Sequence, residues 1–98
     1  YTSGIIPVVP ATGEIPEGSV AQAQQAFENL SNLLEAAGTG MDKVVKTTVF
    51  IKEKNDLAAI NEVYAKYFTS KPARSCVAVK TLPKNLLCEI EVIAAVEE

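Results

Sequence analysis

Few side chains in this sequence can do acid–base or nucleophilic chemistry, and an arginine is the first candidate. The chain of 98 residues contains no histidine, so it lacks the commonest general base and the commonest metal ligand. Arg74 stands in the segment KPARSC, between a proline and a predicted strand. Its planar guanidinium could grip a carboxylate through two parallel hydrogen bonds. The ordinary alternative is a solvated or salt-bridged surface arginine.

Two glutamates are the candidates for acid–base work. Glu89 and Glu91 alternate on a predicted strand, so they share one face and stand about 7 Å apart. Such a pair can divide the roles of acid and base when the two environments differ. Leu87 and Ile93 on the same face make it half apolar. The alternative is that both carboxylates lie on a solvent-exposed strand face and have no role in chemistry.

Three further side chains could assist a site. Ser3, in the segment TSG, has no histidine to deprotonate it, so it could offer a hydrogen bond or be an ordinary strand serine. Cys76 follows close after Arg74, a cation that could activate its thiol, or it is small, buried and inert. Asn61 lies inside a predicted helix, where asparagine is unfavourable, which hints at a polar task.

Cys76 and Cys88 are too few for a four-ligand zinc site and lack CxxC spacing, so we expect reduced thiols.

Length and charge narrow the class of protein. The chain makes one domain over residues 1–98 and buries only roughly 65% of its unfolded surface, so oligomerisation would stabilise it. A net charge of -3 argues against binding to nucleic-acid phosphates. No apolar run approaches the roughly 18 residues of a membrane span. No signal peptide is visible, but the chain opens at Tyr1 rather than Met, so a preceding segment could be missing.

The first half of the chain predicts a strand, a loop and a helix. Residues 1–6 are rich in β-branched and aromatic side chains and predict a strand, and residues 7–18 carry prolines and glycines and predict a loop or hairpin. A helix is predicted from Ser19, with Gln22 at the spacing of a capping box. Its apolar positions recur at steps of three and four until Gly38, the predicted C-terminal cap.

A second strand and a second helix follow. Residues 43–53 alternate with apolar members on both faces, which is typical of a strand covered on both sides. Asn55 or Asp56 caps the second predicted helix, which ends near Phe68.

The predicted order of elements is β-α-β-α-β-β. Residues 75–81 and 87–96 predict two strands, and the short link LPKN between them favours an antiparallel pair. Right-handed crossovers would place both helices on one face of a mixed sheet, an α+β arrangement. The opposite face then holds Val44, Phe50 or Ile93 without a helix to cover it, and we expect it to be a docking surface for copies of the chain.

Several segments together resemble the Rid/YjgF family. They are TSG-x-IP-x-x-P-x-TGE, LEAAG, VVKTTVFI, ND-x-x-x-x-NEVYAKYF, KPARSCVAV and LPK-x-x-x-x-EIEVIA, in this order and spacing over nearly the whole chain. The resemblance implies a chorismate-mutase-like α+β fold and a homotrimer with clefts between neighbouring subunits. It implies a cytoplasmic protein, or a mitochondrial one if a leader is missing.

The resemblance also implies an activity, the hydrolytic deamination of reactive 2-aminoacrylate (2-iminopropanoate) and 2-iminobutanoate to 2-oxo acids and ammonia. The carboxylate-binding arginine of the family falls on Arg74 and its water-positioning glutamate on Glu89. Its further substrate-binding positions fall on Ser3, Asn61 and Cys76. An imine is already electrophilic, so positioning matters more than a strong base, and the expected mechanism needs no metal and no cofactor.

The chain departs from the family pattern at several places. The N-terminal strand of the family, with a cleft-lining tyrosine, is absent from these residues, Ile5 replaces a usual glutamine, and Leu57 replaces a common phenylalanine. The loop from Asn61 to Arg74 is slightly short. The alternative function is therefore a ligand-binding or regulatory member, a translation inhibitor or chaperone-like protein, that keeps the fold without the activity. No basic aromatic patch is present, so nucleic acid is not an expected partner.

Overall fold

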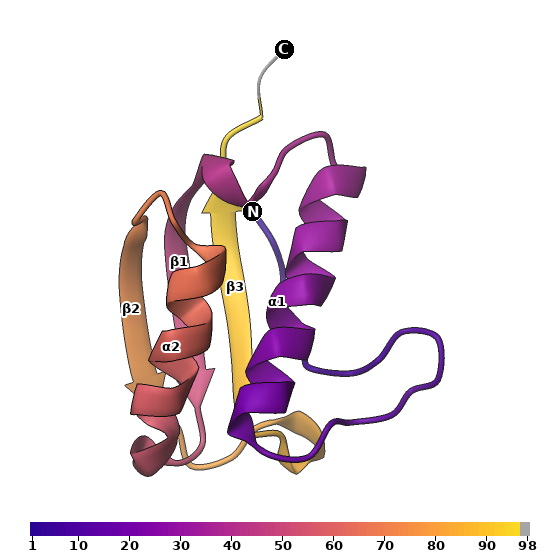
Figure 1. Ribbon diagram of the computed structural model, residues 1–98, viewed down its shortest axis with the longest axis vertical. Coiled ribbons are helices and arrows are strands. Elements are labelled where there is room, and N and C mark those ends of the chain that lie inside the picture. Colours follow the sequence, from indigo (N-terminus) through magenta and orange to yellow (C-terminus); the bar gives the residue numbers. More distant parts are fainter. Residues whose placement is uncertain (97–98) are drawn as a thin grey trace.

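Two helices cover one face of a small mixed sheet in the computed structural model (Figure 1). The structure describes residues 1–96. The main elements are α1 (Ser19–Ala36), β1 (Val44–Ile51), α2 (Leu57–Tyr67), β2 (Ala73–Ala78) and β3 (Cys88–Ala94). Single 3-10 turns occupy Met41–Lys43, Lys54–Asp56 and Pro83–Asn85. The α+β class and the placement of both helices on one face agree with the prediction.

The strand β1 is central in the sheet order β2-β1-β3. It pairs parallel with β2 and antiparallel with β3. The predicted antiparallel pair of the last two strands is therefore wrong, because β2 and β3 flank β1 on opposite sides. The link is also longer than the prediction assumed, since β2 ends at Ala78 and β3 begins at Cys88. Within the link, Lys84 and Asn85 adopt positive φ and turn the chain past the end of β1.

The N-terminal segment follows the outer edge of β3 without forming the predicted strand. Only Ile5 makes a bridge, exchanging backbone hydrogen bonds of 2.6 and 3.1 Å with Ile90. Further along, the backbone N–H of Val92 donates to the side-chain Oγ1 of Thr2 at 2.9 Å instead of to a backbone carbonyl. The backbone N–H of Thr2 still donates to the carbonyl of Val92 at 2.9 Å, so the two segments remain paired in one direction while the Thr2 hydroxyl satisfies the Val92 N–H.

A bulge at the start of β1 changes which side chains face the helices. The register with β3 shifts between Val44 and Lys46. As a result Val44 is buried and Val45 is 55% exposed, the reverse of the simple alternation. Val44 therefore does not belong to the uncovered face, whereas Phe50 and Ile93 do lie on it, half-buried.

The start of α1 also differs from the prediction. Gly18, with φ of 89°, is the N-cap residue, and no side chain caps the helix. Gln22 is instead buried, where its Nε2 donates to the carbonyl of Pro16 and its Oε1 accepts from the backbone N–H of Leu87. Gln22 thus joins the loop before α1 to the chain that leads into β3. Gly38 follows the last turn of α1 with φ of 87°, the backbone conformation that the predicted C-terminal cap requires.

The core fills the space between the helices and the sheet. Phe27 of α1 makes edge-to-face contacts with three rings of the second helical segment, at centroid distances of 5.5 to 6.0 Å: Tyr64, Tyr67 and Phe68. Ile60, Val49, Ile90 and Val92 lie in the same buried cluster. Among residues 1–96, neither helix is long and apolar enough to cross a membrane.

Candidate functional site

Arg74 lies on the outer strand β2 and turns towards α2. Its register partner on β1 is Thr47, which is fully buried beneath the helices, so Arg74 projects to the same side of the sheet. The guanidinium Nη1 donates a hydrogen bond of 2.7 Å to Oδ1 of Asn61. Its carbon Cζ lies 4.8 Å from the ring centroid of Tyr64, within the range of a cation–π contact. The structure thus brings together Arg74 and Asn61, two of the predicted site residues.

Two residues that support this arrangement were not predicted. The Tyr64 hydroxyl and Oγ1 of Thr47 share a hydrogen bond of 2.8 Å, and the Tyr64 ring stacks on Phe68 with centroids 4.4 Å apart. A sequence signal for Tyr64 exists, because Asn61 and Tyr64 are three residues apart on one helix and such residues share a face. No sequence signal singles out Thr47, since its contact depends on how α2 packs over β1.

A hollow of about 480 Å³ opens beside Arg74, between α2 and the start of β2. Its lining is mainly apolar and aromatic, with a second cation in the loop: Tyr64, Ala65, Phe68, Thr69, Lys71, Pro72 and Arg74. Cys76 lies two residues beyond Arg74 on the same face of β2, where it is half-buried against the core with a free thiol. This side of the molecule therefore offers a cation beside a recess, an arrangement suited to a small anionic ligand.

Glu89 occupies the other face of the sheet. It lies opposite Phe50 in the β1–β3 register and points away from the helices, half-buried. Its carboxylate stands over the backbone of Gly4: a Cβ added to Gly4 would overlap Oε2 of Glu89 and lie 2.8 Å from its Cδ. Gly4 therefore makes room for this carboxylate. Glycine inside an otherwise β-rich segment was the available signal, because it often marks a close approach. Ser3, next to Gly4, is exposed beside the edge of β3.

Arg74 and Glu89 are not brought together within one chain. The strand β1 separates β2 from β3, and the two side chains project from opposite faces of the sheet. Asn61 and Cys76 accompany Arg74, whereas Ser3 lies in the segment beside the strand of Glu89. One chain thus holds the predicted site residues in two separate groups, which are called half-sites below.

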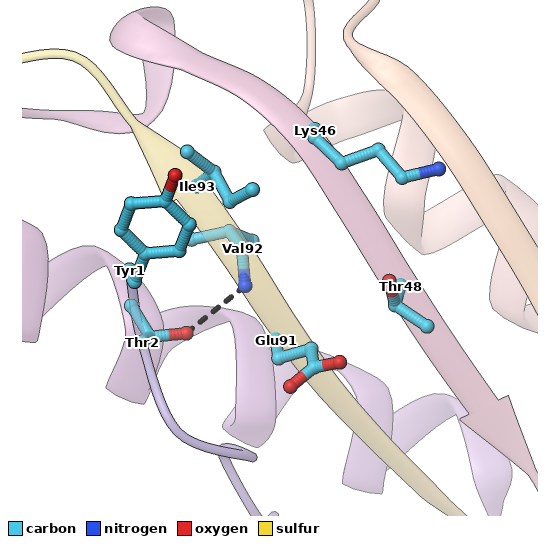
Figure 2. A pocket seen from close by; sticks show the side chains of 7 residues that line it. All are labelled: Tyr1, Thr2, Lys46, Thr48, Glu91, Val92 and Ile93. Atoms are coloured by element: carbon cyan, nitrogen blue, oxygen red, sulfur yellow. Dashed lines mark hydrogen bonds between the residues drawn. The ribbon is translucent and has the colours of Figure 1, made fainter.

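Glu91 shares the open face with Glu89, as predicted, but has different neighbours. It lines a hollow of about 140 Å³ together with Lys46, Thr48 and Ile93, and Tyr1 and Thr2 form its rim (Figure 2). The Nζ of Lys46 extends towards β2, where it donates a hydrogen bond of 2.9 Å to Oγ of Ser75. The two glutamates therefore have separate surroundings, one beside Gly4 and the other in a hollow that Lys46 and Thr48 also line.

Cys88 lies in the core and takes no part in either half-site. It is 2% exposed on the helix-covered face of β3. Burial, followed by the nearby negative charges of Asp56 and Glu89, raises the pKa of its thiol to about 12. This thiol is therefore neutral and unreactive at neutral pH. Within residues 1–96, no three His, Cys, Asp or Glu side chains are grouped as metal ligands.

Comparisons with known proteins place the chain in a family. Residues 1–96 match the family described as endoribonuclease L-PSP. The chain is 50% identical to the Escherichia coli 2-iminobutanoate/2-iminopropanoate deaminase, over 95% of this chain and 76% of that protein. It is 52% identical to a Haemophilus influenzae RutC family protein, with 95% and 75% covered. A crystal structure of E. coli TdcF with bound serine superimposes with a TM-score of 0.93 at 47% identity, covering 98% of this chain and 79% of that one. The chain therefore belongs to the Rid/YjgF family, whose sequence family carries the endoribonuclease L-PSP description.

Proposed function

We propose that this protein hydrolyses reactive 2-imino acids, such as 2-iminopropanoate and 2-iminobutanoate, to 2-oxo acids and ammonia. The observation that carries the proposal is the exposed Arg74 guanidinium, held on one side by Asn61 and Tyr64 beside a recess. The name of the 50% identical deaminase supports the same reaction. The serine bound to TdcF supports it as well, because serine carries the α-carboxylate that every 2-imino acid carries.

Arg74 would hold the substrate carboxylate. Asn61 occupies one N–H of Nη1, and the remaining N–H groups of the fork are available for a bidentate pair with a carboxylate. A charge-assisted contact of this kind fixes the position of C2, the carbon that reacts, because C2 is bonded directly to the carboxylate. Cys76, on the same face of β2, would border the bound carboxylate.

Glu89 would position and activate water. The carboxylate accepts a proton from water as the water oxygen bonds to C2 of the protonated imine, and the electrons of the C=N bond move to nitrogen, giving an amine. The C–N bond of this addition product then breaks as Glu89 returns its proton to the departing nitrogen, and the C2 hydroxyl releases its proton to solvent as the C=O bond forms. The products are ammonia and the 2-oxo acid, and the mechanism needs no metal or cofactor. Ser3 would contribute a hydroxyl hydrogen bond on the same side.

Because the half-sites lie on opposite faces, we also propose that the chain is a one-domain subunit of a homotrimer. In its clefts Arg74 of one subunit would face Glu89 of the next. The open sheet face supports this assembly, since it presents Phe50, Ile93 and Val77, the last of which is 45% exposed. In a closed ring of three subunits, every cleft would receive Arg74 from one subunit and Glu89 from its neighbour. A cytoplasmic location remains a prediction.

The test couples the purified protein to a serine/threonine dehydratase that releases the imines. Trapping with semicarbazide reports how fast the free imine disappears, and light scattering reports the mass of the assembly. The proposal expects faster imine loss and about three times the chain mass. Tight binding of a 2-oxo acid without any acceleration would instead favour a ligand-binding or regulatory role.

A further inference from the structure

We propose that Tyr64 is a positioning residue for Arg74, and that Thr47 anchors Tyr64 in turn. The inference deepens the proposed function, because it concerns how the carboxylate-binding group of the same half-site is aimed. Without such support an exposed arginine samples many rotamers, and ordering it on ligand binding lowers affinity. The contacts around Arg74 remove much of that freedom before any ligand arrives.

The first contacts act on the guanidinium itself. Asn61 holds Nη1 at 2.7 Å, which restrains one corner of the planar group. The Tyr64 ring places its centroid 4.8 Å from Cζ and so restrains a second side of the group. A ligand carboxylate must therefore approach from a side that neither Asn61 nor Tyr64 occupies. Asn61 and Tyr64 lie one turn apart on α2, so a single rigid helix supplies both restraints.

The second contacts act on Tyr64. Its hydroxyl is hydrogen-bonded to Thr47 at 2.8 Å, and Thr47 is fully buried at the β1 position that pairs with Arg74. Its ring stacks on Phe68 and makes an edge-to-face contact with Phe27. The side chain is thus held both at its hydroxyl and through its ring. The β1–β2 register that sets the position of Arg74 therefore also sets the position of Thr47, which anchors Tyr64.

Tyr67 provides a matched control. It belongs to the same helix, and like Tyr64 it makes an edge-to-face contact with Phe27, at 5.5 Å rather than 6.0 Å. The cation–π contact of Arg74, however, is with Tyr64. Leucine at either position removes an edge-to-face contact with Phe27. Tyr64→Leu also removes the hydrogen bond to Thr47, the stack on Phe68 and the support for Arg74, so the melting temperatures of both variants are measured beside their activities.

The experiment compares Tyr64→Leu, Tyr64→Phe and Tyr67→Leu in the full chain, with imine hydrolysis and binding of pyruvate as separate readouts. Tyr64→Leu should raise KM and the Kd for pyruvate on the order of 10-fold, whereas Tyr67→Leu should change both by less than about twofold. Tyr64→Phe keeps the ring but loses the hydrogen bond to Thr47, so its Kd for pyruvate should lie between those of wild type and Tyr64→Leu, and a Kd equal to that of wild type would contradict the anchoring role of Thr47. In an Arg74→Ala background, Tyr64→Leu should have no further effect on pyruvate binding. Equal effects of Tyr64→Leu and Tyr67→Leu would overturn the inference.

A second measurement uses the wild-type protein, so it does not depend on whether a variant of Tyr64 folds. A side-chain N–H proton of Arg74, assigned by its loss in Arg74→Ala, should resonate upfield because it lies over the Tyr64 ring. An Arg74 signal at the ordinary position of a solvated arginine would contradict the proposed support. If the wild type binds pyruvate with these signatures but does not accelerate imine loss, the proposed function fails and the positioning role stands.

Discussion

Arg74 and Glu89 project from opposite faces of one sheet, on the two strands that flank β1. This arrangement is the main structural constraint on any mechanism that uses both side chains. An arginine on the helix side of β2 and a glutamate on the open side of β3 can share a substrate only when two chains meet. Catalysis and assembly are therefore linked in the proposed function.

Substitution of Arg74 should damage substrate binding and orientation together. Arg74→Ala removes the bidentate carboxylate contact, and we expect a loss in kcat/KM on the order of 100-fold. Arg74→Lys keeps the charge without the fork and should recover only part of that loss. Steady-state kinetics in the coupled dehydratase assay measure both effects. Hydrolysis by Arg74→Ala at the wild-type rate would show that Arg74 is an ordinary surface arginine without a role in the reaction.

The two glutamates should behave differently despite sharing a face. Glu89→Gln keeps the size of the side chain but removes the base, so kcat should fall while pyruvate binding persists. Glu91→Gln is the matched control, because Glu91 lies beside Lys46 and Thr48 rather than beside Gly4. Its kcat should remain within about twofold of the wild type. A larger loss in Glu91→Gln than in Glu89→Gln would reverse the assignment.

Gly4→Ala should impair turnover with little effect on stability. The added methyl group would occupy the space of the Glu89 carboxylate, which can swing aside because it is the end of a flexible side chain. We expect kcat to fall at least about 10-fold, since a small misplacement of a catalytic group has a large effect on rate. Gly40→Ala is a control, because its Cβ would meet another flexible carboxylate, that of Asp42, at 2.9 Å. Equal activities of the two variants, measured beside their melting temperatures, would argue against a role for the Glu89 position.

Cys88 should affect stability but not catalysis. Its pKa is raised to about 12, so between about pH 9 and pH 12 the folded chain retains a proton that the unfolded chain loses. The free energy of unfolding contributed by this thiol is therefore fully present below pH 9 and decreases as the pH rises towards 12. Denaturant unfolding of the wild type and Cys88→Ala should show a difference that narrows over this range, with turnover unchanged at neutral pH. A difference that widens would contradict the burial argument.

The sequence predicts the individual helices and strands more completely than it predicts which strands pair with each other. The apolar periodicity of α1 and the alternation around Thr47 and Val49 predict a helix and a strand because both depend on neighbouring residues. The position of β3 beside β1 could not be predicted in the same way, because strand pairing is a non-local choice. One bulged residue was enough to exchange the orientations of Val44 and Val45.

The candidate site was predictable in its residue types but not in its geometry. An arginine in a chain without histidine points to carboxylate binding, whereas the water-activating role of Glu89 is what the family resemblance implies. The contact between Tyr64 and Arg74 depends on how α2 packs over the sheet, and the contact between Gly4 and Glu89 depends on how the first residues follow β3. Neither packing is encoded in a local pattern.

Mixing subunits of two inactive variants tests the two-chain site most directly. Arg74→Ala and Glu89→Gln would be unfolded together in equal amounts, refolded and assayed beside each variant refolded alone. In a mixed trimer, a cleft that takes Arg74 from a Glu89→Gln subunit and Glu89 from an Arg74→Ala subunit is intact. Random assembly makes about a quarter of the clefts intact, so the mixture should recover about a quarter of the activity of refolded wild type. If wild type refolds to an active trimer while the mixture stays as inactive as the separate variants, Arg74 and Glu89 do not meet across a subunit boundary.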